Sequence, residues 1–488
     1  MSATTTPPSR HAPTRGGIAV RLAIALAFAD ASVAVLALPQ IVVRLHTSIS
    51  HVTWVITAYN LALIAGALAV LPVARRLASR RALVAGLAIF GLASLGSGSA
   101  GSLTVLIVWR CVQGVGGALL LCASLPLIGG RDGDGGLRPW AAAAAVGAAV
   151  GPAAGGLLTQ IFDWRAIFFA QAPIAALAII TALSGRTASS GGPADELSPE
   201  APAAAPRPGL SPASANLGLA LISAGLIGAL FIASVLLINV WQVSPLGAAA
   251  ILAVIPIATV LTERLAAARR AAVTGPAGAC VLAGGLAALA LISHRALVPA
   301  VLALAVCGIG LGLAFPALTR VALSTRGTPV ARAARTVAAR EGGLVLGLVL
   351  LTPILVAQLK DTQARATPPI IQAILASPLN LPAKLELGAG LQSASAKAPE
   401  SQLPDIGPAF AHVAAGASPA VQVELAALRP RIQALIQRAA TRSFRWPLVV
   451  CALLSLLAAL ALAIAVAIPH MLSRRGTGGN EDTRGDQA

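Results

Sequence analysis

The sequence predicts an all-α polytopic membrane protein in which two six-helix bundles surround a central cavity. Two features of the composition point to the membrane: of 488 residues, 57% are apolar and only 11% are charged, and the mean hydropathy is +0.83. The third observation is that the apolar residues fall in blocks of about 20, the length that crosses a bilayer as a helix. A soluble domain carries about 25% charged residues, so this composition excludes a soluble enzyme.

Twelve stretches are long and apolar enough to span the hydrocarbon core. They lie near 18–39, 53–72, 82–100, 102–124, 139–160, 165–184, 216–238, 244–263, 275–293, 297–318, 338–358 and 446–469. Basic residues precede the first stretch, as they do in a signal peptide. Its full spanning length and the aspartate Asp30 within it favour a retained helix.

A stretch rich in Ser, Pro and Ala, 185–215, separates the first six spans from the last six and is expected to be a flexible cytoplasmic linker. The expected order is an N-terminal tail (1–17), an N-terminal bundle (18–184), the linker, a C-terminal bundle (216–469) and a C-terminal tail (470–488). Both bundles carry an arginine cluster after their second span. Such weak internal symmetry is typical of transporters built from two related halves.

The arginines also predict the orientation. Most of them fall between spans on the side of the termini, whereas the short loops on the other side hold only Arg44, Arg165 and Arg295. By the positive-inside rule, both termini are expected in the cytoplasm of a protein of the cell (inner or plasma) membrane. Because the basic residues stand in short groups between apolar blocks, the net charge of +18 does not indicate a nucleic-acid partner.

The five cysteines lie inside apolar blocks and form no Cys-x-x-Cys pair. This arrangement predicts neither a disulfide framework nor a zinc site, and we expect no cofactor.

One long segment, 360–443, is expected outside the membrane on the side opposite the termini. Within it, apolar residues recur at helical spacing: Leu425, Leu428, Ile432, Leu435 and Ile436. The pattern predicts an amphipathic helix that lies on the membrane surface or caps the outer mouth, kinked or split at Pro430. A binding role for this segment is an alternative.

Two ionisable residues are expected deep in the membrane, where a charge is costly and usually functional. Asp30 lies in the first span and Arg110 in the fourth, at similar depth, while Glu263 and Glu341 are expected at inner span ends. Burial favours the neutral carboxylic acid, whereas a nearby arginine favours the carboxylate. Asp30 is therefore a candidate proton site; the alternative is a static ion pair that fixes helix packing.

The fifth span contains Gly147, Gly151, Pro152, Gly155 and Gly156. Glycines four residues apart leave one helix face without side chains, so a neighbouring helix can pack very closely, and a proline permits a bend. A helix of this kind suits a part that rocks against its neighbour. Ordinary small-residue packing is the alternative.

These motifs together resemble the major facilitator superfamily, and within it the drug:proton antiporters with fourteen helices. The resemblance rests on Leu106 to Gly117 around Arg110, on Gly147 to Gly156, on Asp30 followed by Ala37-Leu38-Pro39, on Trp54 with Tyr59, and on Arg340 to Gly343. It implies the major facilitator fold, proton coupling through Asp30 and Arg110, and an antiporter motif at the five residues of the fifth span.

Two departures stand beside the resemblance. In the loop between the second and third spans, the family's glycine, aspartate and later glycine are replaced by Leu71, Arg75 and Ala78. Only the basic residues Arg76, Arg80 and Arg81 of this gate loop are retained. The extra central helix pair of the fourteen-helix group is also absent, because 185–215 is too polar to span.

The leading hypothesis is a proton-coupled exporter of small hydrophobic or amphiphilic compounds, of the multidrug-efflux type, working by alternating access as a monomer. Its partners would be protons, a small-molecule substrate and the bilayer. Candidate cavity residues are Gln113, Asn239 and Gln242. The alternative is a non-transporting or specialised protein of the same fold, regulatory or lipid-handling. A membrane-embedded enzyme is disfavoured because the chain lacks an HExxH motif and a Walker A lysine.

Overall fold

The computed structural model describes residues 15–128, 137–184, 210–266, 269–397, 404–415 and 417–477. In this part of the chain all regular secondary structure is helical, and eleven helical segments are long and apolar enough to cross a membrane. The helix α6 (Leu137–Ile161), part of whose side chains lie outside the described residues, supplies a twelfth of 25 residues. The twelve expected spans therefore each correspond to a helix.

The helices of the first half follow the expected spans closely. Their bounds are α1 (Arg15–Arg44), α2 (Ile49–Val52), α3 (Trp54–Val70), η1 (Leu71–Val73), α4 (Ser79–Gly98), α5 (Leu103–Ile128), α6, α7 (Ala166–Phe169) and α8 (Gln171–Ser184). The second half contains α9 (Pro212–Val235), η2 (Leu236–Val240), α10 (Pro245–Leu252), α11 (Val254–Ala266), α12 (Ala271–Ala290), α13 (Leu297–Ala322), α14 (Pro329–Leu375), α15 (Leu381–Lys397), α16 (Gly407–Ala415), α17 (Pro419–Ser443) and α18 (Arg445–Thr477).

Four helices of the second half begin with a hydroxyl residue followed by proline, and in three of them the hydroxyl caps the helix. Ser211, Ser244 and Thr328 are the N-caps of α9, α10 and α14, and each side chain accepts a hydrogen bond from a backbone N–H three residues on, at 3.1–3.2 Å. The proline that follows has no N–H to leave unpaired in the first turn. These caps place the start of α9 inside the expected linker and the start of α14 nine residues before the expected span.

Close helix pairs depend on glycine in both halves. A methyl group at Gly116 of α5 would lie 2.6 Å from the backbone nitrogen of Phe90 in α4, and one at Gly278 of α12 would lie 2.7 Å from that of Ala314 in α13. Any side chain at these positions would push the two helices apart. The same kind of contact thus recurs at equivalent places in the chain, as expected for related halves.

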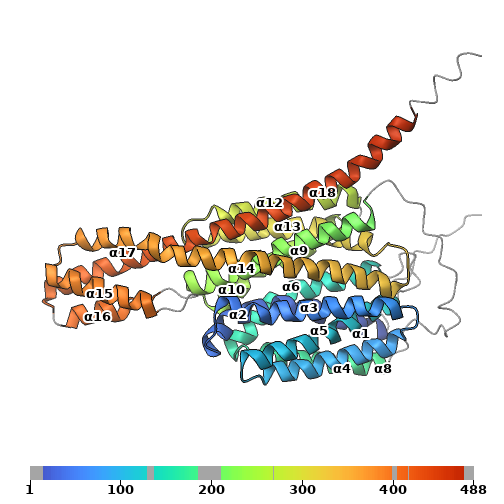
Figure 1. Cartoon of the computed structure of the whole chain (residues 1–488), viewed down its shortest axis with the longest axis horizontal. Helices are drawn as coiled ribbons and strands as arrows, with labels where there is room; N and C mark the ends of the chain where they lie inside the picture. Colours follow the sequence, from blue (N-terminus) through green and yellow to red (C-terminus); the bar gives the residue numbers. More distant parts are fainter. Residues whose placement is uncertain are drawn as a thin grey trace, which may run out of the picture.

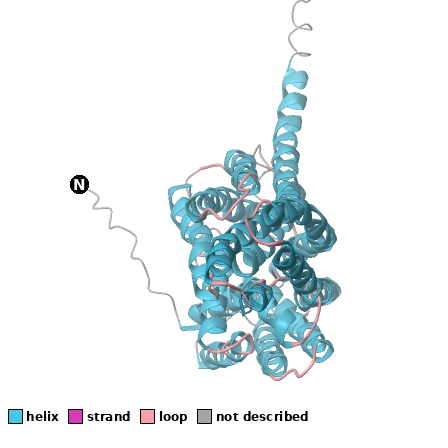
Figure 2. Ribbon diagram, turned by 90° about the vertical axis from the view of Figure 1, so that its left-hand side faces the viewer, coloured by secondary structure: helices cyan, strands magenta, loops and turns pink. Residues whose placement is uncertain are grey.

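Two hydrophobic clusters close the bundle toward its two ends. One combines α1, α3, α4 and α5 with the first turns of α14, where Val330, Ala334 and Val337 are buried. The other combines the second part of α1 with α9, α10 and α13. Between them, α6 packs on α10 and α14 packs on α3, so the two halves touch along both sides. Seen along the long axis, the helices form one closely packed group (Figure 2).

Beyond the bundle, a helical extension formed by the end of α14 with α15, α16 and α17 projects along the long axis (Figure 1). It has its own core, which includes Leu387, Phe410, Leu425, Leu428 and Ile432. The apolar face that was expected to meet the membrane surface or the outer mouth therefore lies within this core. The amphipathic pattern does form a helix, but its apolar face packs against neighbouring helices of the extension. Pro430 lies inside α17 without splitting it.

Other boundaries differ from the expected ones because helices continue past the apolar stretch. The eleventh span was expected at 338–358, whereas α14 runs from Pro329 to Leu375. The last helix, α18, continues to Thr477, into the expected C-terminal tail. Residues 1–14, 185–209 and 478–488, which make up most of the expected tails and linker, lie outside the described residues.

Candidate functional site

Asp30 of α1 and Arg110 of α5 meet inside the first half. The guanidinium Nη1 of Arg110 donates to the carboxylate Oδ2 of Asp30 at 2.6 Å, and both side chains are fully buried. The two helices reach this contact from opposite directions: Asp30 lies 15 residues after the start of α1, and Arg110 lies seven after the start of α5. The structure therefore joins the two residues that sequence reasoning singled out.

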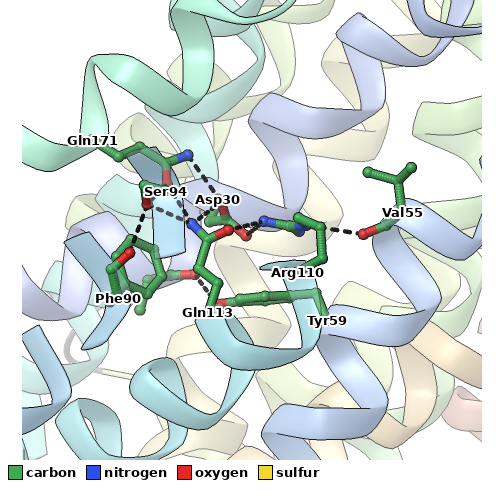
Figure 3. Close-up of polar contacts among 9 residues, drawn as sticks. Asp30, Val55, Tyr59, Phe90, Ser94, Arg110, Gln113 and Gln171 are labelled. Carbon is green, nitrogen blue, oxygen red and sulfur yellow. Dashed lines mark hydrogen bonds and ion pairs between the residues drawn. The ribbon is translucent and has the colours of Figure 1, made fainter. Parts of the chain in front are cut away.

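Two glutamines complete the shell around the carboxylate (Figure 3). The side-chain amides of Gln113 and Gln171 donate to Oδ1 of Asp30 at 3.2 and 2.9 Å. The Gln113 amide also donates to the hydroxyl of Ser94 at 2.8 Å, and its oxygen accepts from Arg110 at 2.8 Å. The two carboxylate oxygens thus face three donors, an arrangement that suits the ionised form of an acid.

Arg110 is fixed on its other sides by α3 and by an aromatic residue. Its Nε donates to the backbone carbonyl of Val55 at 2.9 Å, and its Cζ atom lies 4.2 Å from the ring centre of Tyr59. The ring of Phe168 lies 5.6 Å away. The tyrosine hydroxyl in turn donates to the carbonyl of Ala27 at 3.4 Å. These contacts hold the guanidinium in one orientation toward Asp30.

The site is closed to solvent in this conformation. Asp30 is 1% exposed, and Arg110, Gln113 and Ser94 are fully buried. All its polar side chains come from α1, α4, α5 and α8, with α3 behind the arginine. Exchange of a proton with water therefore requires these helices to part.

Sequence reasoning found three members of this cluster and missed two. Gln113 was expected to line a substrate cavity, whereas the structure places it against Asp30. Gln171 and Ser94 were not singled out, although each is a polar residue within an apolar span. That signal alone identifies many packing residues as well, so only the tertiary contacts distinguish these two.

Asn239 and Gln242 are not brought to the Asp30 cluster. Asn239 lies in η2, which continues α9, and Gln242 follows it; the Gln242 side chain donates to the backbone carbonyl of Asn239 at 2.7 Å. The backbone of Gln242 is in the left-handed region, with φ of 54°. Next to them, Gln437 of α17 donates to the carbonyl of Val240 at 3.0 Å. η2 is therefore in contact with α17, the last helix of the extension.

The glycine face of α6 packs against both halves. A methyl group at Gly147 would lie 2.7 Å from Cα of Ala25, and one at Gly155 would lie 2.7 Å from the carbonyl oxygen of Val33, both in α1. Gly156 faces the other way, toward Pro245 of α10. Gly151 is buried, and the side chain of Pro152 lies outside the described residues.

The arginines of the gate loop are exposed: Arg75, Arg76, Arg80 and Arg81. Arg80 donates to the carbonyls of Ala182 and Leu183 at 2.9 and 2.8 Å, at the end of α8. A cation at a helix C-terminus satisfies carbonyls that have no partner within the helix. The contact of Arg80 is thus with its own half of the chain.

A second buried ion pair, which sequence reasoning did not find, joins Arg340 and Glu341 of α14. Glu341 was expected at an inner span end, but it is only 2% exposed because α14 begins at Pro329, roughly 18 Å earlier along the helix. The Arg340 guanidinium lies 4.1 Å from the ring centre of Phe28 and 5.6 Å from that of Phe315.

This second pair sits where the two halves meet, because Phe28 belongs to α1 and Phe315 to α13. Phe28, which lies under the Arg340 guanidinium, is two residues before Asp30 on α1. The oxygen Oε2 of Glu341 has no hydrogen-bond partner among the described residues. Two acids, one from each half, are thus buried near the centre of the molecule. The described residues hold no group of three His, Cys, Asp or Glu that suits a metal ion.

Comparison with known proteins decides the family. The model of the family described as "Major Facilitator Superfamily" matches residues 21–352. The chain belongs to the major facilitator superfamily. Membership makes it a membrane transporter rather than an enzyme, and it confirms the fold class expected from the sequence.

Curated relatives match over about a third of the chain. The methylenomycin A resistance protein of Bacillus subtilis is 34% identical over 174 residues, which are 34% of this chain and 37% of the relative. The puromycin resistance protein pur8 of Streptomyces alboniger is 39% identical over 172 residues, 34% of each chain. The multidrug resistance protein Stp of Mycobacterium tuberculosis is 30% identical over 167 residues, 33% of this chain and 31% of the relative. Each match thus spans about a third of the relative's own length.

Solved structures share the fold over most of the chain. A bacterial homologue of the human lysosomal transporter Spinster, inward-facing and occupied, superposes with a TM-score of 0.62 at 17% identity, covering 93% of this chain and 97% of that one. A D-xylose–proton symporter superposes with a TM-score of 0.52 at 12% identity, covering 67% and 87%. At such identities the likeness concerns the fold alone.

Proposed function

We propose that this transporter is a proton-coupled secondary exporter of small hydrophobic or amphiphilic compounds, of the multidrug-efflux type. It would reside in the cell membrane with both termini in the cytoplasm, and inward proton flow would drive export. The resistance and export functions in the names of the relatives support this class of substrate.

The observation that carries the proposal is the shell of donors around Asp30. A proton on this carboxylate removes the charge that Arg110 faces and replaces an acceptor with a donor. The amides of Gln113 and Gln171 must then reorient. Because these residues stand on α1, α5 and α8, protonation changes the packing of three helices at once. A protonation step that alters helix contacts is what coupling to a conformational change requires.

Alternating access would rock 18–184 against 216–469. The contacts to be exchanged are those of α6 with α10 and of α3 with α14, on the two sides of the bundle. The glycine face of α6 supports this motion, since a surface without side chains can slide without interlocking. Glu341, buried between the halves, is a second acid that a proton would reach when they separate.

The test is proton movement in vesicles. A transported compound is first identified by reduced accumulation in an efflux-deficient host, with loss of the effect on adding an uncoupler. Purified protein in vesicles with a pH-sensitive dye should then take up protons when that compound is added. Asp30→Asn should abolish this signal, whereas Glu386→Gln, which changes an exposed acid of the extension, should retain it. Unchanged proton uptake in Asp30→Asn would remove Asp30 from the mechanism.

A second candidate, a non-transporting or specialised member of the fold, is favoured by two features. One is the exposed Arg75 at the place of the family's gate aspartate, and the other is the extension with its own core. No change in accumulation for any compound of a broad panel, with the protein present in the membrane, would favour this candidate over export.

A further inference from the structure

A pocket of about 560 Å³ lies between the two halves, beside α2, the first turn of α3 and the middle of α14. Ser50, Thr53, Trp54 and Thr57 form one wall, and residues of α14 from Leu348 to Ala357 form the other. The volume falls in the range of about 300–1,000 Å³ that is usual for small-molecule sites. Neither the Asp30 cluster nor the Arg340–Glu341 pair lines it.

The α14 wall offers hydrogen-bonding groups that the protein does not use. Thr352 is 7% exposed, and its hydroxyl oxygen has no hydrogen-bond partner among the described residues. One residue on, Pro353 has no backbone N–H, so the carbonyl of Val349, which also lines the pocket, lacks the donor that a helix normally supplies. A buried hydroxyl without a partner is costly, and a bound molecule would satisfy it.

Apart from its hydroxyl residues the pocket is lined by apolar side chains, two of which are exposed at the surface. The side chain of Trp54 is 48% exposed and that of Val349 is 57% exposed. The lining residues fall within Ser50–Val73 and Pro329–Gln358, two segments long and apolar enough to span a membrane. A tryptophan near the end of such a span is typical of the membrane interface.

No charged residue lines the pocket. An ion bound there would lose its hydration without gaining a counter-charge, whereas an uncharged molecule avoids this cost. The hydroxyls of Thr53, Thr57 and Thr352 can form hydrogen bonds with a hydroxyl, ester or amide group of a ligand. The side chain of Trp54 and the aliphatic side chains of α14 can pack against the apolar part of the same ligand.

We infer that the α3–α14 pocket binds an uncharged amphiphile that enters from the bilayer, with its polar group at Thr352 and its apolar body against Trp54. The assignment deepens the proposed function by naming a substrate class. That the bound molecule is exported rests on the proposed function. Binding itself requires no proton gradient.

The experiment measures binding of a monoacylglycerol with a brominated acyl chain to the whole protein in detergent, by quenching of tryptophan fluorescence. Brominated analogues with an anionic carboxylate or a cationic ammonium head serve as charged probes. Saturable quenching by the uncharged probe, lost in Trp54→Phe, is expected. Quenching that persists unchanged in Trp54→Phe, or equal affinity for the charged probes, would overturn the assignment.

Two threonine variants provide the matched comparison. Thr352→Val removes the pocket hydroxyl with little change of shape and should weaken binding about 3- to 10-fold, the effect of one net hydrogen bond. Thr336→Val removes another buried hydroxyl of α14 that has no partner among the described residues and lies outside the pocket. It should leave the affinity unchanged. Equal affinity in both variants would exclude the role of Thr352.

These outcomes are separate from those for the proposed function. If Asp30→Asn retains proton uptake while the uncharged probe binds as described, proton coupling through Asp30 fails and the pocket stands. If coupling is confirmed but the probe does not bind, the pocket assignment fails alone. Displacement of the brominated probe by chloramphenicol, an uncharged drug, would identify drugs as occupants of the pocket. If the probe stays bound in the presence of chloramphenicol, the occupants are lipids. Both results support binding of an uncharged amphiphile in this pocket.

Discussion

The carboxylate of Asp30 lies 2.6 Å from the guanidinium of Arg110, although 80 residues separate them in the chain. Both side chains are shielded from water, and the contact joins α1 to α5. Burial of two charges is repaid only when the geometry is good and the remaining donors and acceptors are satisfied. Here Gln113, Gln171 and the carbonyl of Val55 satisfy most of these groups, while Nη2 of Arg110 has no hydrogen-bond partner among the described residues.

Arg110→Lys should lower proton-coupled transport about 10- to 100-fold, the effect of losing hydrogen bonds to a charged group. Lysine keeps the charge but cannot contact Asp30, Gln113 and Val55 together as the planar guanidinium does. Vesicle proton uptake measures the effect. Arg44→Lys, at an exposed arginine, is the control. Coupling at the level of the unmodified protein would show that the charge alone suffices.

Gln171→Leu should lower proton-coupled transport about 3- to 10-fold, the effect of one net hydrogen bond. The Gln171 amide donates to Oδ1 of Asp30 at 2.9 Å, and leucine cannot make this contact. Vesicle proton uptake on addition of the transported compound measures the effect. Gln40→Leu, which removes a side chain bonded to the carbonyl of Thr159 instead, should leave the uptake unchanged. Equal uptake in the two variants would show that the Gln171 contact has no part in coupling.

Glu341→Leu should destabilise the protein by about 3–5 kcal/mol, because it leaves the guanidinium of Arg340 buried without its partner. The double variant Arg340→Met with Glu341→Leu should be considerably more stable than the single one. Thermal unfolding in detergent of both single variants and the double variant gives the coupling between the two residues. Additive effects would mean that the pair contributes no interaction.

Gly155→Ala should destabilise the bundle by about 1–3 kcal/mol, the usual cost of overpacking. The added methyl would lie 2.7 Å from the carbonyl oxygen of Val33, which is backbone and cannot rotate away. Gly284→Ala provides the control, since nothing lies within 4 Å of its added methyl. That variant should be neutral or stabilising, because alanine favours a helix over glycine. Equal melting temperatures for the two variants would contradict the close contact of α1 and α6.

Leu387→Ala should loosen the extension by about 2–5 kcal/mol through loss of a core side chain. Leu387 is fully buried in that core, whereas Leu385, two residues earlier on α15, is 66% exposed and serves as the control. Hydrogen exchange should rise in α15, α16 and α17 of the Leu387 variant and remain unchanged in α3. Equal exchange in both variants would mean that the extension has no independent core.

The sequence alone was sufficient for the number of membrane helices, since spanning length and apolarity are properties of each stretch by itself. The N-caps Ser211, Ser244 and Thr328 are also local signals, because each acts with its proline within one turn, but the expected spans began later than α9 and α14 do. The expected span boundaries differ from the helix bounds where a helix continues through charged residues. Arg332 and Arg335 precede the expected start of the eleventh span at residue 338, yet α14 continues through both of them from Pro329.

What the tertiary structure decided is which side chains share a site. Asp30 and Arg110 were recognisable from the cost of a charge in the membrane, a property of each residue alone. The contacts of Gln171 and Ser94 with Gln113 depend on how α4, α5 and α8 rotate about their axes, and no local pattern encodes that rotation. For the same reason the amphipathic face of α17 indicated a helix but not its partner, which the packing of the extension supplied.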